Sequence, residues 1–133
     1  MEIRLHIPKS LLTAINQLYE LEQKLKKHGD PNNLQRNVNK MKDAFAEEGL
    51  LMADIGGGQH RIGLACEDPM GLSFKETRTD LDATISGVGT DNLVVVEVIK
   101  PIIRAVFRDS AGEFARVVQK GVVIVESQKE KKL

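Results

Sequence analysis

Residues 93–126 decide the fold of this chain: they read LVVVEVIKPIIRAVF (93–107), RDSAGE (108–113) and FARVVQKGVVIVE (114–126). Two long runs rich in valine and isoleucine flank a short Asp-Ser-Ala-Gly connector, a pattern that predicts a β-hairpin. Pro101 and Gly121 indicate a bulge or an edge within it. A two-stranded ribbon is not stable alone in water. The rest of the chain must therefore cover part of it or hold it out towards a partner.

The first arm of this hairpin carries a regular pattern of charge. If the arm alternates regularly, one face carries basic side chains interleaved with aliphatic ones, namely Lys100, Ile102, Arg104, Val106 and Arg108. Such a face is suited to binding an acidic protein surface. The same charges would also protect a long strand edge from aggregation. Both interpretations stay open at this point.

Two helices are predicted ahead of the β-rich part. Residues 9–28 have a wide apolar stripe, with Ser10 as the expected cap and Gly29 at the end. A turn at residues 30–33 offers an asparagine as the cap of a second helix, which Gly49 closes. The apolar positions of the second helix have the heptad spacing of helix pairing. The stripe positions of both helices are Leu11, Ile15, Leu18, Leu25, Leu34, Val38, Met41 and Phe45.

Two helices joined by so short a turn form an antiparallel helical hairpin. Each helix has more apolar residues than its neighbour can cover. A second copy of the chain would cover them in a four-helix bundle, and the stripe residues would then form the dimer interface. The alternative is that the stripes pack on the β-rich part of the same chain.

The remaining segments predict short strands and turns. Residues 1–7 alternate like a strand that Pro8 ends, and residues 50–55 and 61–66 are candidate strands around the glycines at 56–58. Residues 72–79 alternate only in part, and residues 81–85 are short and ambiguous. The predicted fold class is α+β, with a helical hairpin in residues 1–49 and a mostly antiparallel β-domain in residues 50–133.

The composition excludes several classes of function. Formal charge is zero, with 19 basic and 19 acidic residues, which points to neither nucleic acid nor a membrane surface. The absence of tryptophan argues against base-stacking platforms. A single cysteine excludes an internal disulfide and fits a reducing compartment. No apolar run reaches the ~20 residues of a membrane span, so a cytoplasmic protein is expected.

No segment predicts an active site or a cofactor. The glycines at 56–58 lead into strand-like sequence instead of a helix, so a flexible turn is favoured over a phosphate cradle. Cys66 and His60 are six residues apart, and nothing in the sequence brings them together as nucleophile and base. The cysteine and histidines lack the paired spacing of zinc ligands. Solvated strand ends and turns account for the acidic residues Glu67, Glu76, Asp80, Asp82 and Asp91.

Taken in order, these parts resemble the GrpE family of nucleotide-exchange factors for DnaK-type chaperones. Residues 11–52 resemble that family's two short helices, from the Leu11-Leu12 start to the Gly49-Leu50 exit. Residues 81–85 lie where the family has a short strand. Residues 92–104 and 115–126 resemble the paired strands of its β-wing. The family's long N-terminal coiled-coil helix has no counterpart, and residues 50–80 exceed what the family needs.

The resemblance implies a homodimer through a four-helix bundle, with each β-wing offered to the nucleotide-binding domain of a DnaK-type chaperone. Binding to the opened state of that domain would weaken its hold on ADP by linkage, without bond chemistry. Ile99, Lys100 and Arg104 correspond by position to the chaperone-contacting region, and Arg108 extends the same basic face. The alternative is a homodimeric scaffold of the same architecture without exchange activity.

Overall fold

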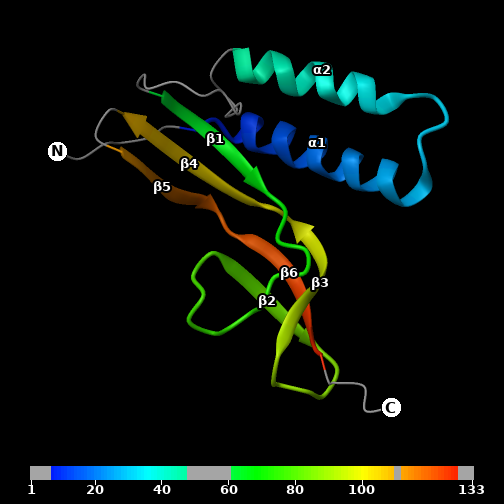
Figure 1. Cartoon of the computed structure of the whole chain (residues 1–133), viewed down its shortest axis with the longest axis vertical. Coiled ribbons are helices and arrows are strands. Elements are labelled where there is room, and N and C mark those ends of the chain that lie inside the picture. Colours follow the sequence, from blue (N-terminus) through cyan, green and yellow to red (C-terminus); the bar gives the residue numbers. More distant parts are fainter. Residues whose placement is uncertain (1–6, 48–60, 110–111, 129–133) are drawn as a thin grey trace. The chain divides into compact units, whose positions relative to one another are not determined.

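The computed structural model describes residues 7–47, 61–109 and 112–128. These residues form two helices followed by six strands in two sheets, which confirms the α+β fold class (Figure 1). The chain divides into two compact units, Met1–Phe45 and Ala46–Leu133, which we call the helical unit and the β unit. The predicted boundary, between residues 49 and 50, lies four residues after the boundary between these two units.

The first helix, α1, spans Lys9–His28, as predicted. Its N-cap is Pro8, so the expectation that Ser10 caps the helix is wrong. Proline is suited to this place because its φ is already helical and its missing N–H would have no partner in the first turn. At the other end Gly29 has a φ of 85°, and its N–H donates to the carbonyl of Leu25. A left-handed residue at this position favours glycine.

The second helix, α2, spans Leu34–Glu47 and returns alongside α1. Its cap is Asp30 and not an asparagine: the carboxylate accepts hydrogen bonds from the backbone N–H groups of Leu34 (2.6 Å) and Gln35 (2.9 Å). These bonds satisfy donors that the first helical turn leaves without a partner. Lys42 of α2 and Glu22 of α1 form an ion pair at 2.9 Å. The predicted helical hairpin is therefore confirmed.

The predicted ribbon is present as two antiparallel strand pairs placed end to end. Its register runs from Leu93 opposite Ser127 to Asp109 opposite Gly112. Pro101 interrupts the first arm and Lys120 the second, so each arm contributes one strand to each of two sheets. The four strands are β3 (Leu93–Lys100), β4 (Ile102–Asp109), β5 (Gly112–Gln119) and β6 (Gly121–Ser127).

Two further strands complete the sheets. Strand β1, Arg61–Glu67, pairs antiparallel with β4 and gives the order β1-β4-β5. Strand β2, Leu81–Ser86, pairs parallel with β6 and gives the order β2-β6-β3. Three of the four pairings are antiparallel, as predicted for most of this domain. The ribbon therefore supplies the central strand of both sheets.

The core of the β unit lies on one face of the sheet β2-β6-β3, where residues from all three strands and from the start of β4 are buried together: Leu81, Leu93, Val95, Ile102, Val123 and Val125. The segment 68–80 crosses this face and packs Leu72 and Phe74 against it. It is attached to β3, because Phe74 N–H donates to the Leu93 carbonyl at 2.8 Å. Residues 72–79 therefore form a cover for the core. Their first residues are joined to β3 by backbone hydrogen bonds on either side of a bridge at Ser73.

Some sequence predictions concern residues that the structure does not describe. The strand at 50–55 and the glycine turn at 56–58 lie outside the described residues. So does the strand at 1–7, apart from Ile7, which is not in a strand. Within the described part of the chain, neither helix is long and apolar enough to cross a membrane.

Candidate partner-binding surface

The end of β3 presents two of the predicted partner-binding residues to solvent. The pairing of β3 with β6 shifts register between Val95 and Glu97 and again between Val98 and Lys100. A bulge inserts an extra residue and turns its side chain away from the regular alternation. The inserted residues are Val96 and Ile99, and both are exposed aliphatic side chains. Lys100, next to Ile99, is also exposed.

The continuous basic face predicted for the first arm does not form. Pro101 ends β3, and Lys100 and Arg104 consequently belong to different sheets. Alternation places residues on one face only along an uninterrupted strand. Ile102, predicted on that face, is buried in the core of the β unit, and Val106 is buried as well. The side chain of Arg108 lies outside the described part of the structure.

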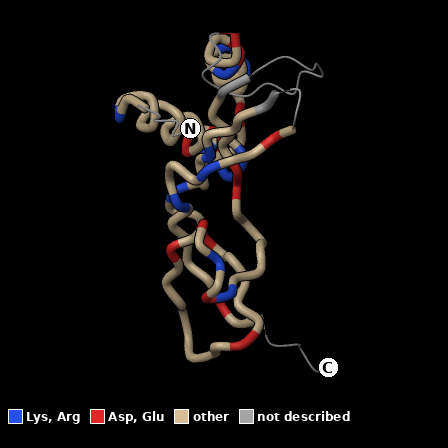
Figure 2. The backbone as a smooth tube through the Cα atoms, turned by 90° about the vertical axis from the view of Figure 1, so that its left-hand side faces the viewer, with Lys and Arg blue, Asp and Glu red and all other residues tan. Residues whose placement is uncertain are grey.

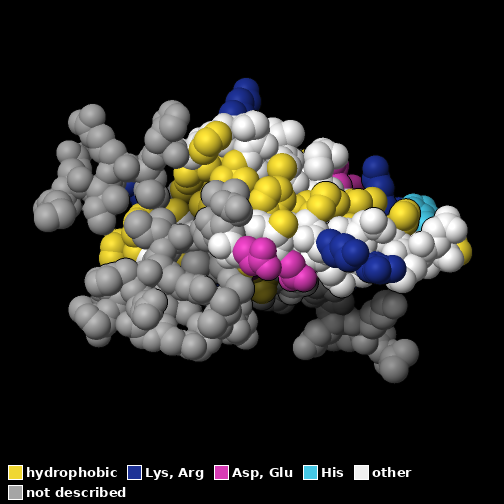
Figure 3. All heavy atoms as spheres, turned by 90° about the horizontal axis from the view of Figure 1, so that it is seen from above, with side chains coloured by type: hydrophobic (Ala, Val, Ile, Leu, Met, Phe, Trp, Pro, Cys, Tyr) yellow, Lys and Arg dark blue, Asp and Glu magenta, His cyan; other side chains and the backbone are white. Residues whose placement is uncertain are grey.

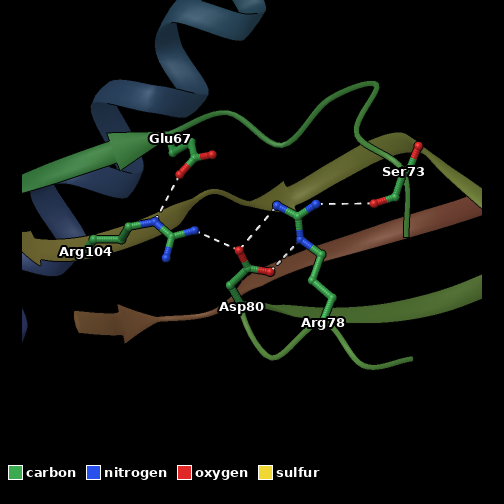
Figure 4. A network of polar contacts seen from close by, with 5 residues as sticks. All are labelled: Glu67, Ser73, Arg78, Asp80 and Arg104. Carbon is green, nitrogen blue, oxygen red and sulfur yellow. Dashed lines mark hydrogen bonds and ion pairs between the residues drawn. The ribbon is translucent and has the colours of Figure 1, made fainter. Parts of the chain in front are cut away.

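Arg104 is held in a network of polar contacts (Figure 4). Its Nε donates to Glu67 Oε2 at 3.0 Å, and its Nη2 donates to Asp80 Oδ2 at 2.7 Å. Glu67 ends β1, whereas Asp80 immediately precedes β2. The guanidinium therefore bridges the first strands of the two sheets. Charge-assisted hydrogen bonds are the stronger ones in proteins, so this side chain is committed to holding the β unit together.

Asp80 accepts hydrogen bonds from a second guanidinium. Arg78 donates from Nε to Asp80 Oδ1 at 2.6 Å and from Nη2 to Oδ2 at 3.3 Å, and its Nη1 reaches the Ser73 carbonyl at 3.3 Å (Figure 4). The hydrogen bonds from Arg78 lower the pKa of Asp80. Partial burial opposes this effect, but the hydrogen bond and positive charge of Arg104 reinforce it, and the pKa lies below its ordinary value.

Nothing in the sequence predicts this network. The expectation that its acidic members lie at solvated strand ends and turns is wrong for Asp80, whose side chain is only 15% exposed. Arg104 lies 37 residues from Glu67 and 24 from Asp80. No local pattern predicts an ion pair across such separations. Arg104 therefore acts as a structural side chain here, and Ile99 and Lys100 are the described partner-binding candidates that remain exposed.

The helical unit has an apolar groove between its two helices. It has a volume of about 380 Å³ and is lined by both helices, with Leu18, Leu21, Met41 and Phe45 as its larger apolar side chains. Seen from above, hydrophobic side chains gather in a row along the face that the helices present (Figure 3). An exposed apolar row of this kind marks a surface for another protein more often than a plain solvent face.

The predicted dimer residues divide by burial. Ile15, Leu18 and Val38 are buried within the chain. Leu34 and Met41 are exposed, whereas Leu11, Leu25 and Phe45 are partly exposed. A second copy can contact only side chains that are accessible. The surface available to it is therefore the exposed part of the predicted stripe.

The other residues considered for chemistry do not form a site in the described part of the chain. Cys66 is exposed on β1, and His60 lies outside the described residues. Among described residues, no three histidine, cysteine or acidic side chains are grouped where they could share a metal ion. Acidic and basic residues are interspersed along the described strands of the β unit (Figure 2).

Comparison with known proteins found no matching family model, no matching curated protein and no matching solved structure.

Proposed function

We propose that this chain is a GrpE-like co-chaperone that dimerises through its helical unit and binds the nucleotide-binding domain of a DnaK-type chaperone through its β unit. The observation that carries the proposal is the exposed apolar groove between α1 and α2, with Met41 and Phe45 at its rim. Two such hairpins joined face to face would cover these side chains in a four-helix bundle. A cytoplasmic location is part of the proposal, in keeping with the single cysteine.

The chaperone would contact the exposed end of β3. Ile99 offers an apolar side chain and Lys100 a cation beside it, a combination suited to a partly acidic partner surface. If the chain binds the opened state of the nucleotide-binding domain more tightly than the closed state, the chaperone's affinity for ADP falls by the same factor. Such an activity needs no catalytic residue.

The decisive experiment measures release of a fluorescent ADP analogue from the host's DnaK-type chaperone. The wild-type chain is expected to accelerate release, and Ile99→Asp is expected to reduce the acceleration about tenfold or more, because it places an uncompensated charge in the interface. Met70→Asp is a matched control, since Met70 and Ile99 are both 51% exposed. Met70 lies in a turn whose next residue, Gly71, is hydrogen-bonded to Val95 and not to the end of β3. An unchanged rate at saturating wild-type protein, with no complex formed, would exclude exchange activity.

A homodimeric scaffold without exchange activity is the second candidate. The observation that favours it is the engagement of Arg104, which leaves fewer exposed cations near the end of β3 than the sequence predicts. Both candidate functions require the dimer, and only the first requires binding to a DnaK-type chaperone. A dimer that forms no complex with the chaperone would support the scaffold.

A further inference from the structure

A second contact surface lies at the opposite edge of the sheet from Ile99 and Lys100. Strand β2 is outermost in the order β2-β6-β3, and β6 is its only strand partner among the described residues. The outer edge of such a strand presents backbone N–H and C=O groups that a further strand can pair with. Edge strands in native proteins are usually covered or blunted, so an open one beside a cleft indicates a binding site.

The cleft lies beside β2 and has a volume of about 660 Å³. Ala83 and Ile85 of β2 line it, as do Phe74 of the segment crossing the core and Leu93 at the start of β3. Leu81, on the same face of β2, is buried in the core. One face of β2 is therefore apolar along its length and continues from the core into the cleft.

The other face of β2 is polar and carries one acidic side chain. Asp82 lies on this face and is 66% exposed, and its ion pair with the exposed Lys120 is long at 3.9 Å. The cleft is lined by Glu76 and Asp91 against a single base, Lys75. The cleft therefore combines apolar side chains with a net acidic lining. A strand added to β2 would place one set of alternate side chains beside this cleft and the other set beside Asp82.

We propose that β2 is a strand-addition site, where an extended segment of a partner protein with alternating aliphatic and basic residues pairs with the outer edge. Its aliphatic side chains enter the cleft beside Ile85 and Phe74, and its basic side chains lie beside Asp82. Backbone hydrogen bonds would supply affinity, and the two faces would supply selectivity. The site does not depend on the proposed exchange activity, because it uses neither β3's exposed end nor the helical groove.

The test uses the full chain and a fluorescein-labelled peptide in which lysine and valine alternate over the length of β2, with binding followed by fluorescence anisotropy. We expect this peptide to bind and a block peptide of the same composition to bind at least about tenfold more weakly, because only alternation separates the two faces. Amide hydrogen exchange is expected to slow along residues 81–86 in the complex. Equal binding of both peptides, or no binding, would overturn the proposal.

Two variants locate the site. Ile85→Lys places a charge in the cleft and is expected to weaken binding about tenfold or more. Val88→Lys makes the same change at a nearby side chain that is 96% exposed and does not line the cleft, and it should leave binding unchanged. Equal weakening by both variants would contradict a specific site on β2.

A charge exchange tests the recognition of basic residues. Asp82→Lys is expected to reduce binding of the lysine–valine peptide and to favour a glutamate–valine peptide of the same pattern. No change in the preference would show that Asp82 does not face the bound segment. Self-association that Ile85→Lys abolishes would show instead that a second copy of β2 occupies the edge, and would exclude a partner protein as the occupant.

Discussion

Asp80 lies between two guanidinium groups, and its carboxylate accepts hydrogen bonds from both Arg78 and Arg104. Its side chain is mostly buried, and its negative charge offsets part of the cost of removing the two guanidinium groups from water. Removing one member of such a group leaves the others partly buried without a partner, and that penalty exceeds the net gain of an ordinary hydrogen bond. The ion-pair network that links β1 to the residue before β2 should therefore be sensitive to the replacement of one carboxylate oxygen of Asp80 by an amide nitrogen.

Asp80→Asn is expected to lower the free energy of unfolding by about 1–3 kcal/mol at neutral pH, because the amide keeps the shape and loses the charge. Urea unfolding followed by circular dichroism measures the change. The matched control is Asp82→Asn, two residues further along, whose side chain is 66% exposed. It should change stability little, since exposed ion pairs contribute little. Equal effects of the two variants would contradict a structural role for the network.

The same variant has a defined pH dependence. The pKa of Asp80 is lower in the folded chain than its ordinary value, chiefly through Arg78, so the unfolded chain binds the proton more readily. The stabilisation from this carboxylate is therefore complete above about pH 4 and is lost as the pH falls through the folded-state pKa. The stability difference between wild type and Asp80→Asn should shrink on acidification below about pH 4. A difference that is constant with pH would show that the charge is not its source.

At the scale of elements, the sequence predicts the helices and strands that hydrophobic periodicity determines. It does not predict strand pairings between residues that are distant in the sequence. Both helices and the ribbon were predictable, because their apolar patterns extend over many residues. The pairing of β2 with β6 was not, since nothing near Leu81 identifies Gly121 as its neighbour. Pro101 signalled an irregularity, but the transfer of the chain between two sheets depends on tertiary packing. The exposed position of Ile99 follows from a bulge. The bulge changes which side chains face solvent along β3, and the order of residue types does not reveal it.

The start of α2 provides a test at this scale. Asp30→Ala removes the carboxylate that accepts from Leu34 and Gln35, and it is expected to cost about 1 kcal/mol and to reduce helical signal. Far-ultraviolet circular dichroism and urea unfolding measure both effects. Asp43→Ala, at an exposed position within α2, is the control and should be neutral or slightly stabilising, because alanine is the better helix former. A loss of stability in the control alone would contradict the assigned cap.

At the scale of the whole molecule, the chain consists of two units with different kinds of surface. The helical unit has an apolar groove between α1 and α2. The β unit has a core beneath the segment 68–80, and its exposed apolar side chains, such as Ile99, lie on strands and turns. An accessible apolar groove is stabilised when another surface covers it. The proposed assembly follows from this difference, with association assigned to the helices and partner recognition to the strands.

Met41→Lys tests that assignment. A lysine in the groove would remove apolar contact and bring two like charges together across a symmetric interface, so the dimer is expected to dissociate at concentrations where the wild type remains associated. Light scattering at several concentrations measures the mass. Met70→Lys makes the same exchange in the β unit and should leave the dimer intact. A wild-type chain that is monomeric at micromolar concentration would exclude the interface.

The ribbon's position in the middle of both sheets also constrains the order in which the β unit assembles. Strands β1 and β2 precede the ribbon in the chain, yet each pairs only with a strand of the ribbon among the described residues. During synthesis both leave the ribosome before any partner strand exists, and neither can complete its backbone hydrogen bonds until the ribbon has closed. Their docking then brings together residues distant in sequence, which slows folding. Newly made β1 and β2 therefore pass through an interval as unpaired strands, when mispairing between chains competes with folding.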